Sequence, residues 1–129
     1  QVGPMTVTAF PGLHPIESYG FRVEGPSSNG DRDVVIAYTG DTDLCQGMQD
    51  MAEGVDLLLA ECGFTEADPP RGIHMSGKRV GELTLASQAK TTVLTHIQPW
   101  TDPAVPVLEF QVATGTVPEV AGPGKVWDL

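Results

Sequence analysis

Short apolar runs dominate the hydrophobic pattern of the chain, and most of them have the length of a β-strand. Most of the runs are rich in β-branched or aromatic residues, and most have Gly, Pro or Asp at one end, a pattern that is typical of strands that end in turns. The runs cover Thr6–Phe10, Tyr19–Glu24, Val34–Tyr38, Val55–Glu61, Thr91–Thr95 and Lys125–Leu129. The polar segment Gly25–Asp33 joins the second run to the third and predicts a hairpin turn.

Three other segments have the 3.6-residue spacing of amphipathic helices. They run from a cap at Thr42 or Asp43 to Gly54, from a cap at Ser76 to about Ala89, and from Pro103 to about Ala113. Side chains such as Ser, Thr and Asp accept hydrogen bonds from the first turn of a helix, which is why they favour the cap. The positions expected to face inward are Leu44, Met48, Met51 and Ala52 in the first helix, and Val80, Leu83, Ala86 and Ser87 in the second.

A hairpin followed by alternating strands and helices predicts an α/β fold, with a mixed sheet and flanking helices. The chain has 129 residues, so we expect a single domain over residues 1–129. In such a layered fold the loops at the strand ends gather along one edge of the sheet. We expect any chemistry to lie in those loops.

Charge and cysteine content narrow the choice of partner and compartment. The formal net charge of −10 disfavours nucleic acid as a partner, because nucleic-acid binding depends on Lys and Arg to neutralise phosphates. No apolar run approaches the roughly 18 residues of a membrane span, so no membrane association is expected. Cys45 and Cys62 form no CxxC pair and predict buried free thiols, which favours the cytoplasm, although one disulfide stays open.

All three histidines and one aspartate of the chain lie at the boundaries of predicted elements. His14 follows the first strand, Asp41 and His96 directly follow apolar strands, and His74 comes just before a helix cap. Imidazole and carboxylate are ligands that suit zinc and related ions, so these residues form a candidate metal site. Structural interpretations stay open: Asp41 as a helix cap, His74 as a loop residue bonded to a backbone carbonyl, and His96 as a core residue.

Five short strings of the chain carry a family resemblance. The strings "HPIESYGFRVE", "YTGDT", "LLLAECGF", "GIHMSGKRVGE" and "VLTHIQPW" occur in the order and approximate spacing of the metallo-β-lactamase superfamily. They resemble most its phosphodiesterase branch, the branch of RNase Z, over about Met5 to Asp102. The resemblance implies an αββα sandwich, of which this chain is similar to the second half.

The resemblance also implies a role for each candidate residue. His14 matches a ligand of one metal, Asp41 the aspartate that bridges two metals, and His96 a ligand of the second metal. His74 matches a catalytic histidine that is not a ligand and that helps the leaving oxygen or the phosphate. Glu61 matches the acid of a His-Glu-Ala-Thr string, where this chain reads AECG, and would support the site from behind the ligands.

The chemistry implied by the resemblance is metal-assisted hydrolysis of a phosphodiester. The expected cofactor is a pair of zinc ions, and manganese is also compatible with a His and Asp ligand set. The hydroxyl groups of Thr39 and Thr42 are predicted to orient the Asp41 carboxylate. Candidates for holding the substrate phosphate are Ser76 at a helix N-terminus, Arg71 and Lys78, with solvated positions as the alternative for the two cations.

The His-x-His-x-Asp-His string of the superfamily, which supplies two ligands to each metal, is absent from the chain. We therefore expect a C-terminal portion of the fold that is inactive alone. Its inner face would be apolar, and would pair with the missing N-terminal half or with a second copy.

The expected substrate follows from the short segment between two candidate ligands. Only 26 residues separate His14 from Asp41, which leaves no room for the arm that grips transfer RNA in RNase Z. We therefore expect a small phosphodiester such as a cyclic nucleotide, and the last two strings resemble actinobacterial, hence bacterial, proteins of this kind. The alternatives are a tRNA 3′-processing endonuclease and, from another class, a non-catalytic interaction or regulatory half-domain.

Overall fold

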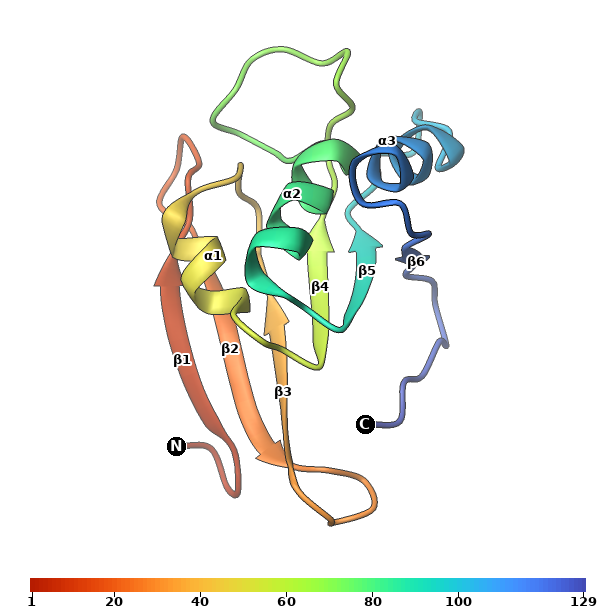
Figure 1. The fold of residues 1–129 in the computed structure, drawn as a ribbon. Helices are drawn as coiled ribbons and strands as arrows, with labels where there is room; N and C mark the ends of the chain where they lie inside the picture. The colour runs from red at the N-terminus through yellow and green to blue at the C-terminus, as the bar shows by residue number, and fades with distance from the viewer.

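Six strands form one sheet, with helices lying over one of its faces, in a computed structural model that describes residues 1–129 (Figure 1). The strands are β1 (Thr6–Pro11), β2 (Tyr19–Pro26), β3 (Asp33–Tyr38), β4 (Leu57–Glu61), β5 (Thr91–Thr95) and β6 (Glu119–Val120). The helices are α1 (Gln46–Ala52), α2 (Gly77–Ser87) and α3 (Ala104–Thr114). Helices α1 and α2 cover the sheet, and α3 packs against α2.

The sheet is mixed, as the sequence predicts. Strands β1, β2 and β3 are antiparallel, and the expected hairpin joins β2 to β3. Strands β3, β4, β5 and β6 run parallel to one another in that order, with α1, α2 and α3 in the crossover connections. Parallel strands connected in this way end along one edge of the sheet, and the loops that follow β3, β4 and β5 therefore meet there.

The core lies between the helices and one face of the sheet. Its largest buried apolar side chains are Met48, Met51, Leu58, Leu83, Leu94 and Phe110. The inward positions predicted for α2 are confirmed for Val80, Leu83 and Ser87, whereas Ala86 is exposed. Because neighbouring helices meet the sheet at this face only, apolar residues on the other face have no cover.

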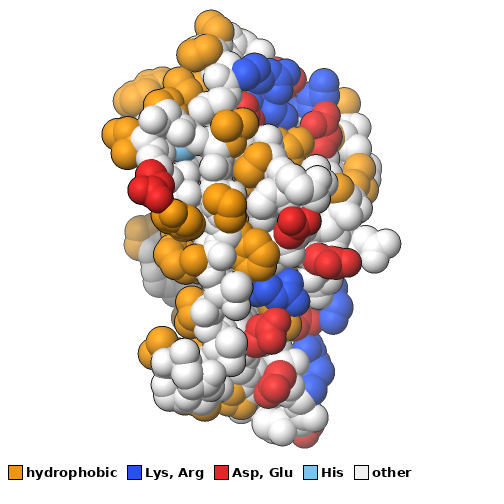
Figure 2. Space-filling model, turned by 90° about the vertical axis from the view of Figure 1, so that its left-hand side faces the viewer, with side chains coloured by type: hydrophobic (Ala, Val, Ile, Leu, Met, Phe, Trp, Pro, Cys, Tyr) orange, Lys and Arg blue, Asp and Glu red, His pale blue; other side chains and the backbone are white.

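The uncovered face carries exposed apolar and aromatic side chains on its antiparallel half. Alternation along a strand places Val7, Phe21 and Tyr38 on the side opposite the buried Ala37. These three are 38%, 42% and 41% exposed. Figure 2, which looks onto the β1 edge, shows hydrophobic side chains gathered toward the left, whereas most acidic and basic side chains lie toward the right.

Three sequence predictions of local structure are wrong. The first helix begins at Gln46 with Cys45 in the cap position, because the side chains of Thr42 and Asp43 bond to other loops instead. The last strand is Glu119–Val120 rather than Lys125–Leu129, because only the former reaches β5. Cys45, predicted to be buried, is only half-buried, whereas the prediction of a buried free thiol is confirmed for Cys62. No helix has the length and apolar character to cross a membrane.

Candidate metal centre

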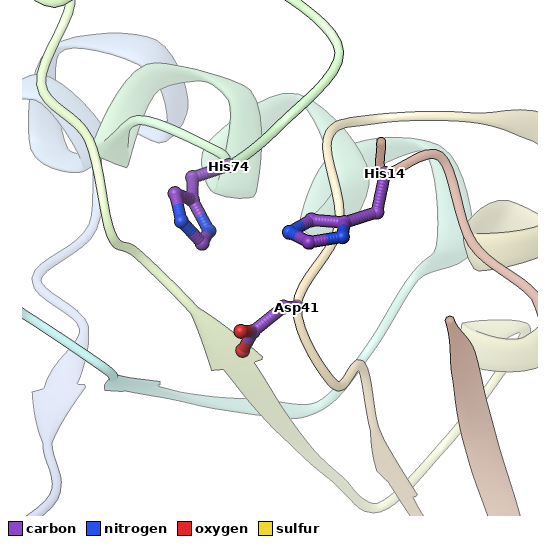
Figure 3. Close-up of side chains that lie close together, drawn as sticks. All are labelled: His14, Asp41 and His74. Carbon is purple, nitrogen blue, oxygen red and sulfur yellow. The ribbon is translucent and has the colours of Figure 1, made fainter. Parts of the chain in front are cut away.

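Three side chains from separate loops converge at the edge where the parallel strands end. His14 follows β1, Asp41 follows β3, and His74 lies shortly before α2. One potential ligand atom of each lies within 4.8 Å of those of the other two, and all three residues are half-buried. Figure 3 shows the two imidazole rings and the carboxylate pointing toward a common space. Residues far apart in sequence thus form one cluster.

His96 lies beside this cluster. Its Nε2 is 3.8 Å from Asp41 Oδ1, and its ring centroid is 5.2 Å from that of His74. The predicted ligand set is His14, Asp41 and His96, with His74 outside it; in the structure it is His74 whose ligand atom lies within 4.8 Å of those of both His14 and Asp41. His96 has a φ of 59°, in the left-handed region that few side chains adopt, and such backbone strain is found most often at functional sites.

A buried carboxylate orients the His74 ring. His74 Nδ1 lies 2.6 Å from Glu61 Oε1, and Glu61 is fully buried. Glu61 also accepts backbone N–H groups from Thr42 (3.0 Å), Gly63 (2.8 Å) and Met75 (3.2 Å). The Glu61 carboxylate accepts all of these bonds, so His74 Nδ1 is a donor as well. The other ring nitrogen of His74, Nε2, therefore does not face Glu61.

The ionisation of Glu61 reflects opposing effects. Burial raises the pKa of Glu61 above its ordinary value, while the hydrogen bonds from Gly63, Thr42 and His74 act in the opposite direction. A histidine that ligates a metal usually donates its other ring N–H to such a carboxylate, which fixes the ring and raises its basicity. The predicted supporting position of Glu61 thus has a geometric basis in this structure.

Two glycines make room for the cluster. Gly40 has a φ of +59°, and a Cβ there would lie 2.6 Å from Tyr19 O, so the turn before Asp41 needs glycine. A Cβ on Gly63 would lie 2.9 Å from His74 Cγ and 3.1 Å from His96 Cδ2. Gly63 was not among the residues predicted from the sequence; its place two residues after Glu61, the last residue of β4, was the available signal.

The hydroxyl groups predicted to hold Asp41 bond elsewhere. Thr39 Oγ1 donates to Gly40 O and accepts from Glu61 N. Thr42 Oγ1 donates to Asp43 O and accepts from Leu13 N. Backbone groups lie closer to both hydroxyls than the Asp41 carboxylate does, so these threonines fix the loops rather than the carboxylate itself.

The candidate phosphate-binding residues surround a glutamate instead of the cluster. Ser76 is fully buried; it caps α2 by accepting from Arg79 N, as predicted, and donates to Glu66 Oε2 at 2.6 Å. Arg71 and Lys78 are exposed and lie 3.9 and 3.7 Å from Glu66 Oε1. The Ser76 hydroxyl is therefore committed within the fold, while a phosphate role of the two cations stays a prediction.

The arrangement fits a divalent ion of the zinc class. Two imidazoles and one carboxylate are ligands that zinc prefers, and three protein ligands leave a coordination position open for chemistry. The bond between His74 and Glu61 is a further feature of metal-binding histidines. The donor chemistry of the cluster thus agrees with the expected cofactor class.

Comparison with known proteins identifies the family. Residues 1–97 match the family described as the β-lactamase superfamily domain, and the chain belongs to this family. An uncharacterized protein of Mycobacterium tuberculosis, Rv1339, is 35% identical over 101 residues, which are 78% of this chain and 35% of that protein. Ribonuclease Z of Microcystis aeruginosa is 29% identical over 85 residues, which are 62% of this chain and 27% of that enzyme.

Solved structures of the family share the fold. The metallo-β-lactamase fold protein YhfI from Bacillus subtilis superposes with a TM-score of 0.85 at 24% identity, over 99% of this chain and 51% of that one. The resemblance drawn from the five sequence strings is thereby confirmed, as is the α/β fold class with its mixed sheet. The chain spans about a third of the length of the curated relatives described above.

Proposed function

We propose that this chain carries part of the active site of a metal-dependent phosphodiester hydrolase. The observation that carries the proposal is the convergence of His14, Asp41 and His74 within ligand distance, with His74 held by a buried carboxylate. The chain belongs to the β-lactamase superfamily domain family, which supports the proposal. One relative, from Bacillus subtilis, bears the name probable metallo-hydrolase YhfI. Zinc is the expected ion, with manganese as the alternative.

The residues divide the work between holding the ion and moving a proton. His14, Asp41 and His96 would hold the cation, with Asp41 shared between two ions in a complete site. When bound, such ions supply a Lewis acid and an activated water. Because His74 Nδ1 donates to Glu61, Nε2 is the ring nitrogen left for the reaction. In the imidazolium form Nε2 also carries a proton, which it would deliver to the leaving oxygen or donate in a hydrogen bond to the phosphoryl group.

The proposed substrate is a small phosphodiester, with a cyclic nucleotide as the first choice. The segment between His14 and Asp41 is occupied by β2, β3 and their connecting turns, and the net charge of −10 gives no broad basic surface. A tRNA 3′-processing nuclease is the second candidate, favoured by the similarity to ribonuclease Z of Microcystis aeruginosa. We further propose a bacterial cytoplasmic location, which the free thiols of Cys45 and Cys62 support.

The site requires a second polypeptide half to be complete. The face carrying Val7, Phe21 and Tyr38 lacks cover, and this chain alone has too few protein ligands to serve both ions of a two-ion site. We propose that an N-terminal half of the fold covers this face and adds ligands, with a second copy of the chain as the alternative. Replacing Phe21 by Asp should block association in sedimentation analysis, whereas unchanged association would exclude this face.

The test of function uses this chain combined with such an N-terminal half. Metal content is measured together with hydrolysis of a cyclic nucleotide and of a generic phosphodiester. Asp41→Ala should abolish metal binding and turnover together, whereas Asp31→Ala, in the distant β2–β3 turn, should change neither. An assembled protein that binds no metal and hydrolyses neither substrate would favour the non-catalytic alternative. Cleavage of precursor tRNA alone would favour the nuclease.

A further inference from the structure

The two residues that directly follow Asp41 are bonded to the loops that carry His14 and His74. Leu13, next to His14, donates its N–H to Thr42 Oγ1 at 2.8 Å and accepts from Asp43 N at 2.8 Å. Thr42 N donates to Glu61 Oε1, the same oxygen that accepts from His74. The spacing of the cluster is therefore linked to the dipeptide Thr42–Asp43.

The Asp43 carboxylate extends this link into the loop that carries His74. Its Oδ2 accepts from Gly72 N at 2.7 Å, two residues before His74, and its Oδ1 accepts from Leu44 N at 2.7 Å. Oδ1 also accepts from Arg79 Nη1 at 2.5 Å. Asp43 is 4% exposed, so these bonds form away from solvent.

Arg79, in the first turn of α2, closes the connection from the other side. Besides Asp43, its Nη1 donates to His74 O at 2.9 Å. Its Nε donates to Ser76 Oγ at 3.2 Å and lies 3.4 Å from Glu66 Oε2. Arg79 is only 3% exposed. One rigid guanidinium thus holds the backbone of His74 against the turn that follows Asp41.

Stability alone is a weak explanation for such a buried ion pair. Removing two charges from water is costly, and apolar residues of similar volume often stabilise a fold as well or better. A guanidinium, by contrast, has a planar set of donors that fixes the relative position of several acceptors. The acceptors here belong to the two loops that present Asp41 and His74.

We propose that Arg79 and Asp43 are positioning residues of the metal centre, which set the spacing between Asp41 and His74 without touching the ion or the substrate. The proposal rests on the proposed metal site. It goes beyond the ligand set, because it assigns the geometry of that set to an ion pair behind it.

A matched control exists at the opposite end of the sheet. Asp56, at the start of β4, is also a buried aspartate that accepts from an arginine and from a backbone N–H. It accepts two bonds of 3.0 Å from Arg32 and one of 2.9 Å from Val35 N. Asp56→Asn and Asp43→Asn therefore remove similar charges from similar surroundings, but only the second lies behind the cluster.

The experiment titrates the chain, combined with the proposed N-terminal half, with Co²⁺ and follows the visible absorption of the bound ion. Asp43→Asn should weaken Co²⁺ binding about 10- to 100-fold, the usual effect of losing a group that orients a ligand. Asp56→Asn should keep the parent affinity in its folded fraction. Equal affinity of Asp43→Asn and parent, or equal weakening by Asp56→Asn, overturns the proposal. A parent that binds no Co²⁺ refutes the metal site itself, a distinct result.

A second pair of variants decides the question if Asp43→Asn does not fold. Arg79→Lys keeps a cation opposite Asp43 but cannot reproduce the planar fork, and Arg79→Met removes the charge at similar length. The proposal predicts that Co²⁺ affinity falls in the order parent, Arg79→Lys, Arg79→Met. Equal affinity of all three in their folded fractions overturns it.

Discussion

His74 Nδ1 and Glu61 Oε1 are 2.6 Å apart, and this bond joins the half-buried edge of the candidate site to a fully buried carboxylate. The ring of His74 also packs edge-on against Phe64, with centroids 4.9 Å apart. Both contacts restrict the ring. His74 is therefore preorganised before any ion or substrate arrives, which is the condition for a group that must act in a fixed direction.

Glu61→Gln is the first test of this relationship. An amide keeps the shape of the side chain, but in either orientation its NH₂ group faces a backbone N–H that accepts nothing: those of Gly63 and Met75, or that of Thr42. We expect a loss of about 1–3 kcal/mol in the free energy of unfolding. We also expect turnover of the assembled enzyme to fall about 10- to 100-fold. Urea unfolding and initial rates measure the two effects, and an unchanged rate would show that His74 does not depend on Glu61.

Substitution of His74 and His14 separates a proton donor from a ligand. If His74 delivers a proton, His74→Ala should lower turnover about 10²- to 10⁴-fold while metal content stays near that of the parent. His14→Ala should lower metal content and turnover together. Because His74 lies within ligand distance of His14 and Asp41, the opposite result is well defined: a similar loss of metal from both variants would make His74 a ligand.

Gly63→Ala tests how closely the two histidine rings depend on the backbone of β4. The added methyl group would press on the rings of His74 and His96, at 2.9 and 3.1 Å. We expect weaker Co²⁺ binding. Gly122→Ala is the control, since its Cβ would meet only the flexible Lys125 side chain at 3.8 Å. Unchanged Co²⁺ affinity in Gly63→Ala would mean that the rings move apart freely.

Much of the fold could be predicted because the local hydrophobic patterns agree with the strand pairing in the sheet. Apolar runs of strand length and helical spacing located β1 to β5 and all three helices. The segment Lys125–Leu129 has the length and apolar content of a short strand, but sheet membership depends on reaching β5, which Glu119–Val120 does instead. A strand at a sheet edge is decided by tertiary contact, and that information is not local.

The site was predictable to the extent that strand ends meet at one edge. That rule brought His14, Asp41, His74 and His96 together from the sequence alone. The supporting contacts were not predictable in this way. Asp43 and Arg79 are 36 residues apart, and the Thr42 hydroxyl has several acceptors nearby in space, so the choice of partner depends on three-dimensional packing.

Asp56 provides a stability prediction that is independent of the metal site. Hydrogen bonds from Arg32 and from Lys90 hold the pKa of this carboxyl well below its ordinary value, against the effect of burial. Lys90 Nζ lies 2.8 Å from Asp56 Oδ1. These contacts of Asp56 join the hairpin turn between β2 and β3 to the starts of β4 and β5, at the end of the sheet opposite the histidines.

The lowered pKa fixes the sign of the pH dependence. The unfolded chain binds a proton at Asp56 at about pH 3.9, whereas the folded chain does so only at lower pH. The stabilisation is therefore complete above that value and is lost as the pH falls toward the folded pKa. Asp56→Asn should cost about 1–3 kcal/mol near pH 7, because a charged acceptor is lost. Its stability should also fall less than that of the parent between about pH 5 and about pH 3. Urea unfolding at these pH values measures both effects, with Asp31→Asn as the exposed control. Parallel pH profiles for the parent and Asp56→Asn would show that this carboxylate does not govern acid sensitivity.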